Sequence, residues 1–297
     1  MKLFDAHCHL QDPRVLHMAP KLIESACQSG VVEFAVNGTH EKDWHLVKQM
    51  SEDYPCIIPN FGLHPWFVAD RSPNWFQILR QYFEATPCAA VGEIGLDKGS
   101  HARKIDFNDQ VEVFKKQLEL AKDMNRPASI HCVSAFDDLL QLLNEAGPFP
   151  AGIILHSYMG SAEMVPQLVK VGAYFSFSGH LMPMKEQTAK KMLKAVPLER
   201  ILLETDAPDA LPKNPEFFIN DDAQCSVSPT DGGSTESTSP TASLNHPANI
   251  HVVLNYVASL LDMPPEDLAE LSCKNAVHLF SYEGSKPLLD KQQSVAG

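Results

Sequence analysis

Two histidines near the start of the chain have a spacing that suits metal binding. His7 and His9 lie in the run FDAHCH at residues 4–9. On an extended strand, side chains at positions i and i+2 leave the same face, so the two imidazoles would converge on one point. At the carboxyl end of a strand that faces the inside of a barrel, they could bind one metal ion. The alternative is a pair of ordinary polar residues near a strand end, and the pair alone does not decide between the two.

Four further ligand-type side chains follow other short apolar runs. Glu93 follows AAVG, His131 follows ASI, His156 follows IIL, and Asp206 follows LLET. A solitary histidine or carboxylate is more often an ordinary polar residue than a ligand. Together with the first pair, however, six such residues end five predicted strands at matching heights. Because the active sites of parallel barrels lie at the carboxyl ends of the strands, the pattern favours one shared site.

The composition of this set predicts two metal ions. Four imidazoles and two carboxylates exceed the needs of a single four-coordinate zinc ion but suit two divalent ions that share a bridging carboxylate. Glu93 is the candidate bridge. Two ions about 3.5–4 Å apart can polarise a phosphoryl or carbonyl oxygen and lower the pKa of a bound water from 15.7 towards about 7. The predicted chemistry is therefore hydrolysis by an activated water at neutral pH.

The elements that must position these residues alternate along the chain. Short β-branched or apolar runs are separated by amphipathic stretches, which is typical of βα units and a parallel sheet. The eight runs begin at Leu3, Val32, Cys56, Cys88, Ala128, Gly152, Ala173 and Ile201. Apolar stripes at residues 108–124 and 248–261 predict helices on the outside. Eight units predict an α/β fold, a closed (β/α)8 TIM barrel in a single domain.

The positions of three glycines agree with this alternation of strands and helices. Gly30, Gly147 and Gly172 each follow a helical stretch and precede the next strand. We expect each to end its helix in the left-handed conformation.

One segment departs from the βα pattern. Asp209 to Asn245 is rich in Pro, Ser, Thr, Gly and Asp, carries six acidic residues and one basic residue, and lacks apolar periodicity apart from the run FFI at 217–219. This composition predicts an acidic insertion after strand eight that is disordered over most of its length. Ser228 and Ser239, each followed by proline, could be phosphorylated. The polar tail at residues 283–297 is expected to be similarly loose, which leaves residues 1–282 as the barrel domain.

Composition limits the partners and the compartment. Lys plus Arg total 24 and Asp plus Glu total 37, a net charge of −13 that argues against broad adhesion to nucleic acid or anionic lipid. A nucleic-acid substrate needs positive charge supplied locally, as two divalent ions would do. Seven cysteines without a Cys-x-x-Cys pair suit a reducing compartment. With no signal peptide and no long apolar stretch, we expect an intracellular protein, cytoplasmic or nuclear, without membrane association.

Several motifs recur in the order of a known family. They are DAHCHL at 5–10, GLHP at 62–65, GEIGLD at 92–97, LETDAP at 203–208 and NAVHLF at 275–280, together with Gln110, Phe114, Gln117, Leu118, Ala121, Pro127 and His131. The chain thereby resembles the TatD family of metal-dependent deoxyribonucleases, within the amidohydrolase-like barrel superfamily. The resemblance covers nearly its full length.

The resemblance implies a ligand assignment. In the family pattern, one metal is held by His7, His9, Glu93 and Asp206, and the second by Glu93, His131 and His156. It also implies that Asp206 orients or deprotonates the attacking water, as expected of a strand-end carboxylate beside a metal-bound water.

The family's usual reaction is cleavage of phosphodiester bonds in DNA, frequently at a 3′ end, with magnesium or another divalent ion. The implied substrate is DNA, single-stranded or at 3′ ends. A site rich in histidine by itself favours zinc, manganese or cobalt over magnesium. We therefore expect two divalent ions drawn from Mg, Mn and Zn.

Two positions depart from the family pattern. His131-Cys132-Val133 stands where the family commonly has His-Ser-Arg, and Leu244 stands where an Arg usually precedes Asn-x-Pro. Neither replacement can make the charge-assisted contacts of an Arg fork with phosphate. We hypothesise that Lys98, Arg103 and Lys104, on the loop after strand four, substitute for them. The alternative is a solvated, charged loop.

Other residues near the predicted site have two interpretations each. His64 could contact the substrate or make a structural hydrogen bond. His180 could enter the pocket, although surface placement fits it better. Trp66 and Trp75 could stack on a base, although packing in the core or at the rim is the preferred interpretation. Strand alternation is expected to turn Cys8, like Cys132, towards the helices and away from the ligands.

Two rival functions remain. Because fold and metal ligands do not fix the substrate, the same site could hydrolyse amides or lactones. The second rival is a binding protein, a barrel that has lost its activity. The intact ligand set argues against it. No protein partner can be inferred from the sequence.

Overall fold

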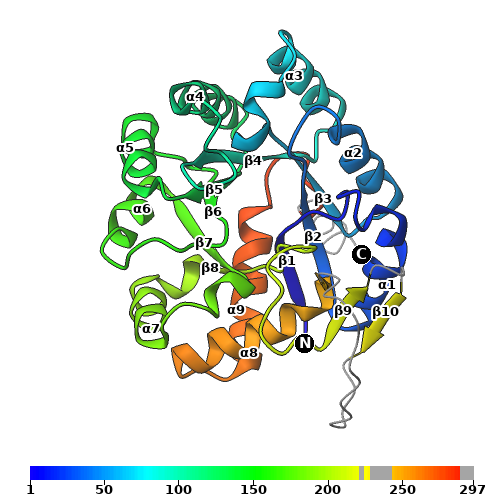
Figure 1. Ribbon diagram of the computed structural model, residues 1–297. Coiled ribbons are helices and arrows are strands. Elements are labelled where there is room, and N and C mark those ends of the chain that lie inside the picture. The colour runs from blue at the N-terminus through cyan, green and yellow to red at the C-terminus, as the bar shows by residue number, and fades with distance from the viewer. Residues whose placement is uncertain (221–223, 228–242, 288–297) are drawn as a thin grey trace.

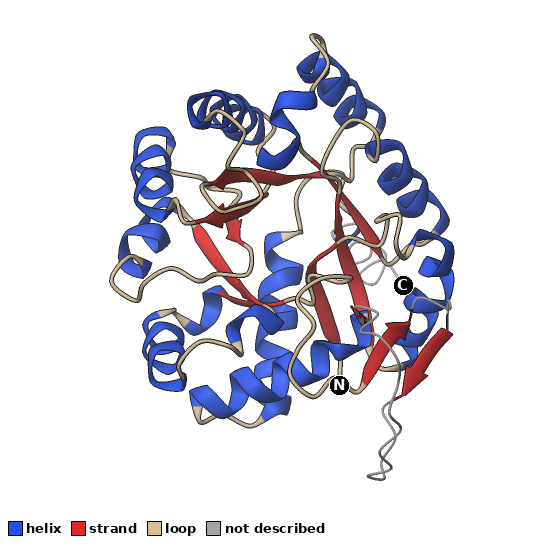
Figure 2. Ribbon diagram, viewed as in Figure 1, coloured by secondary structure: helices blue, strands red, loops and turns tan. Residues whose placement is uncertain are grey.

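The structure, a computed structural model, describes residues 1–220, 224–227 and 243–287. Eight parallel strands pair in sequence order and are surrounded by helices (Figures 1 and 2). The strands are β1 (Leu3–Cys8), β2 (Val31–Asn37), β3 (Ile57–Phe61), β4 (Ala90–Asp97), β5 (Ala128–Val133), β6 (Ile153–Leu155), β7 (Ala173–Phe177) and β8 (Ile201–Leu203). The predicted TIM barrel is confirmed, and each predicted run begins within two residues of its strand.

The barrel closes between the first strand and the segment after the last. His9 N donates to Ala207 O at 2.7 Å, and Asp206 N donates to His7 O at 2.9 Å. These bonds bring residues from the two ends of the barrel sequence side by side at the carboxyl rim.

Amphipathic helices cover the outside of the barrel. They are α1 (Ala19–Gln28), α2 (Trp44–Asp53), α3 (Trp75–Ala85), α4 (Phe107–Asp123), α5 (Phe136–Ala146), α6 (Val165–Val171), α7 (Glu186–Ala195), α8 (Ile250–Leu261) and α9 (Pro265–Leu279). The stripe predicted on α4 is buried at Phe114, Leu118 and Ala121. Among the described residues, no helix is both long enough and apolar enough to cross a membrane.

The three predicted helix ends differ. Gly30 (φ +100°) and Gly172 (φ +106°) are left-handed, as expected. Gly147 is extended instead, with φ −71° and ψ 179°, so that prediction was wrong. Pro148 follows it, and a residue before proline is restricted to extended conformations.

The amino-terminal half of the barrel interior is apolar. Inward side chains from seven strands pack against residues at the end of α9 and form one buried cluster, composed of Phe4, Ala6, Ala35, Ile58, Ala90, Ile154, Tyr174 and Leu202. Helix α9 runs behind the barrel in Figure 1 and covers this opening. Phe280, just after α9, stacks on Phe4 with ring centroids 5.3 Å apart.

Two strands are irregular directly before the predicted ligands. The register of β1 with β2 shifts between Asp5 and Cys8, and that of β4 with β5 shifts between Val91 and Ile94. An extra residue in a strand re-aims the side chains that follow it. As a result, β1 can direct Phe4 and Ala6 inward at one end, and both histidines inward at the other, while Cys8 packs outward.

Glycines permit this irregularity in β4. Gly92 and Gly95 have φ of +148° and +152°. A Cβ on Gly95 would lie 2.0 Å from His131 O, and one on Gly92 would lie 2.8 Å from Ser129 Cβ. Only glycine fits these two positions beside Glu93.

The described parts of the insertion, residues 209–220, 224–227 and 243–245, include a small sheet. Strands β9 (Phe217–Asn220), β10 (Gln224–Val227) and β11 (Leu244–Asn245) form an antiparallel sheet, with β9 in the middle. Ile219 packs against Val15, Met18 and Leu22, beside α1. Ser228 and Ser239 lie outside the described residues.

The predicted tail begins later than residue 283. Ser285 is fully buried, and Lys286 Nζ donates to Tyr54 O at 3.2 Å. Ser285 and Lys286 therefore pack on the barrel, and residues 288–297 lie outside the described residues.

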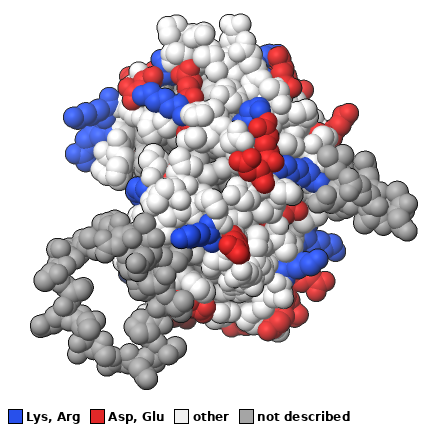
Figure 3. Space-filling model, turned by 90° about the vertical axis from the view of Figure 1, so that its right-hand side faces the viewer, with Lys and Arg blue, Asp and Glu red and all other residues white. Residues whose placement is uncertain are grey.

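Charged side chains do not gather on the face seen in Figure 3. The described Lys and Arg side chains on this face are interspersed with Asp and Glu side chains and form no continuous basic patch.

Candidate metal centre

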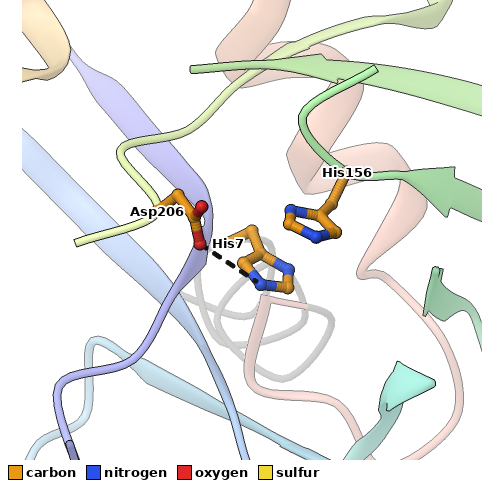
Figure 4. Close-up of side chains that lie close together, drawn as sticks. All are labelled: His7, His156 and Asp206. Atoms are coloured by element: carbon orange, nitrogen blue, oxygen red, sulfur yellow. Dashed lines mark ion pairs between the residues drawn. The ribbon is translucent and has the colours of Figure 1, made fainter. Parts of the chain in front are cut away.

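The structure brings all six predicted ligands together at the carboxyl rim. Their elements are β1 and the residue after it for His7 and His9, β4 for Glu93, β5 for His131, and the segments after β6 and β8 for His156 and Asp206. All are buried except His9, which is partly exposed. Figure 4 shows three of them, with Asp206 directed towards His7. The imidazole rings of His7 and His156 are stacked, with centroids 4.0 Å apart.

One oxygen of Glu93 faces the first group of donors. Oε2 lies 3.2 Å from His9 Nε2 and 3.5 Å from His7 Nε2. Asp206 Oδ1 lies 3.6 Å and 3.8 Å from the same two nitrogens. Two imidazole nitrogens and two carboxylate oxygens thus surround one point.

The other oxygen of Glu93 faces the second group. Oε1 lies 3.0 Å from both His131 Nδ1 and His156 Nε2. It also lies 3.3 Å from Nε2 of His64, whose Nδ1 accepts a hydrogen bond from Trp66 N at 3.1 Å. His64 therefore makes the structural bond and also directs a nitrogen into the site.

The donor set fits divalent cations. Among the residues that the structure describes, three groups of three side chains have their donor atoms within 4.8 Å of one another. His7 Nε2 and His9 Nε2 are only 3.1 Å apart. Such a nitrogen pair can share at most one proton, whereas a cation between them would use both lone pairs. Nitrogen and carboxylate donors together suit zinc, manganese or magnesium.

The imidazoles of His7 and His9 are oriented by neutral partners. His7 Nδ1 lies 2.8 Å from Ser129 Oγ, and His9 Nδ1 lies 2.8 Å from Asn37 O. A bond at Nδ1 fixes the ring and turns Nε2 to the site.

The imidazoles of His131 and His156 each lie beside a carboxylate that sequence reasoning missed. His131 Nε2 lies 3.1 Å from Asp97 Oδ2, and His156 Nδ1 lies 3.4 Å from Glu204 Oε1. Metal-ligating histidines commonly have such partners. Asp97 lies in the motif GEIGLD and Glu204 in the motif LETDAP. Their place in these motifs was the signal from which a role at the site could have been predicted.

The charges of the site favour a cation. Burial alone would raise the pKa of Glu93, but the surrounding imidazoles lower it well below its usual value. Burial would lower the pKa of His9, but its contacts with Glu93 and Asp206 raise it to about 9. For Asp206, burial is outweighed by its hydrogen bond with His180 and by nearby imidazoles, and its pKa falls to about 2. The carboxylates are therefore ionised at neutral pH and attract positive charge.

Comparison with known proteins identifies the family. Residues 4–281 match the family model described as TatD related DNase. The chain belongs to this family. It is 29% identical to the uncharacterized metal-dependent hydrolase YabD of Bacillus subtilis, over 94% of this chain and 98% of the relative. It is 26% identical to the 3′-5′ ssDNA/RNA exonuclease TatD of Pantoea vagans, over 94% and 99%.

A solved structure agrees with the TatD fold. The crystal structure of YJJV, a TatD homolog from Escherichia coli, superposes with a TM-score of 0.79 at 24% identity, covering 94% of this chain and 98% of that one. The family and its relatives make this protein a metal-dependent hydrolase that acts on ester bonds.

In this TatD protein, His180 lies at the edge of the site. It belongs to a 3-10 helix, Gly179–Leu181, and its side chain is half exposed. Its Nε2 is 3.5 Å from Asp206 Oδ2. The predicted surface position is correct, and His180 nevertheless reaches a predicted ligand.

The three proposed substitute cations differ in their surroundings. Lys98 Nζ is 2.6 Å from Asp138 Oδ2 and lies 4.1 Å from the centre of the Phe107 ring, so it is already paired. Arg103 and Lys104 are exposed, and neither has an ion pair with any residue that the structure describes. Of these three cations, Arg103 and Lys104 are therefore the two without a carboxylate partner among the described residues.

The two positions that depart from the TatD pattern lie in different environments. Val133 is 38% exposed at the end of β5. Leu244 packs on the small apolar cluster beside α1, together with Ile219.

The tryptophans and cysteines lie largely where expected. Trp75 is buried in the core, and Trp66 lies at the rim. Cys8 is fully buried, and Cys132 is partly buried; both pack with the residues between strands and helices.

Proposed function

We propose that this protein hydrolyses phosphodiester bonds in DNA, and that it removes nucleotides from an unpaired 3′ end with two divalent ions. The observation that supports this most is Glu93, whose two carboxylate oxygens face two separate groups of donors. A bridging carboxylate between two ions is the arrangement of many phosphodiester-cleaving enzymes. The name of the Pantoea relative, an exonuclease for single-stranded DNA and RNA, supports the substrate and the polarity.

The proposed ligands divide at Glu93. His7, His9 and Asp206 would hold one ion together with Glu93, and His131 and His156 would hold the other, also with Glu93. When bound, divalent ions activate a water and neutralise the charge that develops on the phosphoryl oxygens.

The chain's own residues supply orientation. Asp206 has one oxygen towards the histidine pair and the other towards His180, and its low pKa keeps it ionised. It can therefore accept a hydrogen bond from the attacking water and hold that water in line. Asp97 holds the ring of His131 through a contact at Nε2, which directs Nδ1 at the site. Glu204 places a negative charge 3.4 Å from Nδ1 of His156.

A strand-specific assay tests the proposal. A single-stranded DNA labelled at its 5′ end should shorten progressively from the 3′ end, and the same DNA with a blocked 3′ end should resist. Chelation and, separately, Glu93→Gln should each abolish cleavage, and added Mn²⁺ should restore only the wild type. Cleavage that survives both treatments would contradict the proposal. Hydrolysis of small lactones or amides without DNA cleavage would instead favour the amidohydrolase alternative.

A further inference from the structure

Trp66 is held in an exposed position beside the proposed metal centre. It is 39% exposed, whereas Trp44 is fully buried and Trp75 is 5% exposed. It lies in a 3-10 helix, Pro65–Asp70, directly after the GLHP motif. Its Nε1 donates to Asp97 Oδ2 at 2.6 Å, so the indole is fixed at one edge. An exposed aromatic ring that is fixed loses little conformational entropy when it binds a ligand.

The indole is one side chain away from the second donor group. Asp97 Oδ2, which accepts its N–H, also lies 3.1 Å from His131 Nε2. The ring centroids of Trp66 and His131 are 6.0 Å apart, and those of Trp66 and His64 are 4.8 Å apart. A phosphate bound at the proposed metal centre would therefore have its neighbouring nucleoside within reach of the indole.

A second exposed ring packs partly over the indole. His101 is exposed on the loop after β4, and its ring lies 4.8 Å from that of Trp66 at an angle of 31°. The same loop carries Arg103 and Lys104, the two unpaired cations described above. Flat rings flanked by positive charge are the usual platform for single-stranded nucleic acid.

We infer that Trp66, together with His101, forms a nucleobase subsite, on which the unpaired base next to the scissile phosphate stacks. The inference rests on the proposed function and deepens it. A base inside a duplex has both faces covered by its neighbours, so only an unpaired base can use the platform. The subsite thus gives the enzyme a structural reason to select single strands and frayed ends.

A purely structural role for Trp66 makes a different prediction. If the indole only held Asp97, and through it His131, its loss would lower kcat equally for every substrate. If the indole stacks on a base, its loss should instead raise KM, and only for substrates that carry a base at the critical position. Trp66→Phe retains a ring without the N–H donor, and Trp66→Leu retains apolar bulk without a ring, so the pair separates the two roles.

The kinetic test combines these variants with modified substrates. Matched oligonucleotides would each lack one base at the first, second or third position from the 3′ end. For the wild type, removal of the stacked base should raise KM about 5- to 150-fold, the range for one base–aromatic contact. Trp66→Leu should have the same raised KM with the intact substrate, and removal of the base should not raise its KM further. Trp66→Phe should retain most of the difference in KM between the intact substrate and the substrate without the base. An equal loss of kcat in both variants on all substrates would overturn the inference.

Fluorescence provides a test that does not depend on turnover. With the metal removed by chelation, oligothymidylate should quench tryptophan emission of the wild type, and Trp66→Phe should lose that quenching. Leu198→Ala, which removes an exposed apolar side chain at the opposite end of the barrel, is the matched control and should quench like the wild type. Absence of quenching in the wild type would refute the subsite. If the wild type binds in this way but cleaves no DNA, the proposed function fails and the subsite stands.

Discussion

The two halves of the barrel interior are built from the same strands and differ completely in chemistry. On β6, Ile154 belongs to the apolar cluster, and His156, two residues later, faces Glu93. On β8, Leu202 joins that cluster, and Asp206 follows shortly after the strand ends. The amino-terminal half is closed by α9, and the carboxyl half holds buried polar groups directed at one another. One end of each strand thus stabilises the fold, and the other is free to carry the reaction.

This division predicts opposite effects of substitutions in the two halves. Buried polar groups cost free energy unless they are paired. The carboxyl half should therefore contribute much to activity and little to the stability of the metal-free protein, and the amino-terminal half should do the reverse.

Glu93→Gln should give the largest effect on activity. The substitution removes the charge shared by both donor groups, and we expect kcat/KM on single-stranded DNA to fall by about 10³-fold or more. The melting temperature of the metal-free protein should change far less than in the core variant described next. Retained activity would show that Glu93 does not bridge the ions.

Phe280→Ala should give the largest effect on stability. It removes the ring that stacks on Phe4 beneath the apolar cluster, and such truncations cost about 3–5 kcal/mol. Chemical denaturation measures the loss. The folded fraction should keep its kcat, and a specific loss of kcat would mean that the two halves are coupled.

Asp97→Asn should have an intermediate effect. It weakens the partner that fixes His131, and replacing such a partner typically lowers metal affinity or activity by about 10- to 100-fold. Metal titration of wild type and variant would measure this. Ser129→Ala is the matched control, because Ser129 contacts Nδ1 of His7 as Asp97 contacts His131. It removes a neutral hydroxyl, so its effect on metal affinity should be smaller. The reverse order would contradict the assignment of these partners.

Arg14→Ala should have the smallest effect. The guanidinium binds Asp209 with two bonds, of 2.9 and 2.7 Å, and links the loop after β1 to the segment after β8. Both groups are exposed, and exposed ion pairs contribute about 0–1 kcal/mol. Denaturation should show a loss within that range. A larger loss would mean that this link contributes to closure of the barrel.

The sequence contains the periodic features of the fold and site. Alternation along a strand places His7 and His9 on one face, and runs such as AAVG and IIL mark where ligands follow. These inferences are local, since each needs only a few consecutive residues.

The remaining features depend on contacts between distant residues. The shifts within β1 and β4 depend on neighbouring strands, so alternation alone could not predict that Phe4 and His7 share the interior. Pairing of β9 with Leu244 joins segments whose composition resembles a loop. Asp97 and Glu204 become partners of histidines only when separate strands meet at the rim.

The central claim is that the two oxygens of Glu93 serve two cations. Anomalous diffraction from crystals grown with Mn²⁺ would test it most directly. The account predicts two peaks, one among His7, His9 and Asp206 and one beside His131 and His156, both within bonding distance of Glu93. Peaks that avoid Glu93, or no peak at this rim, would contradict it.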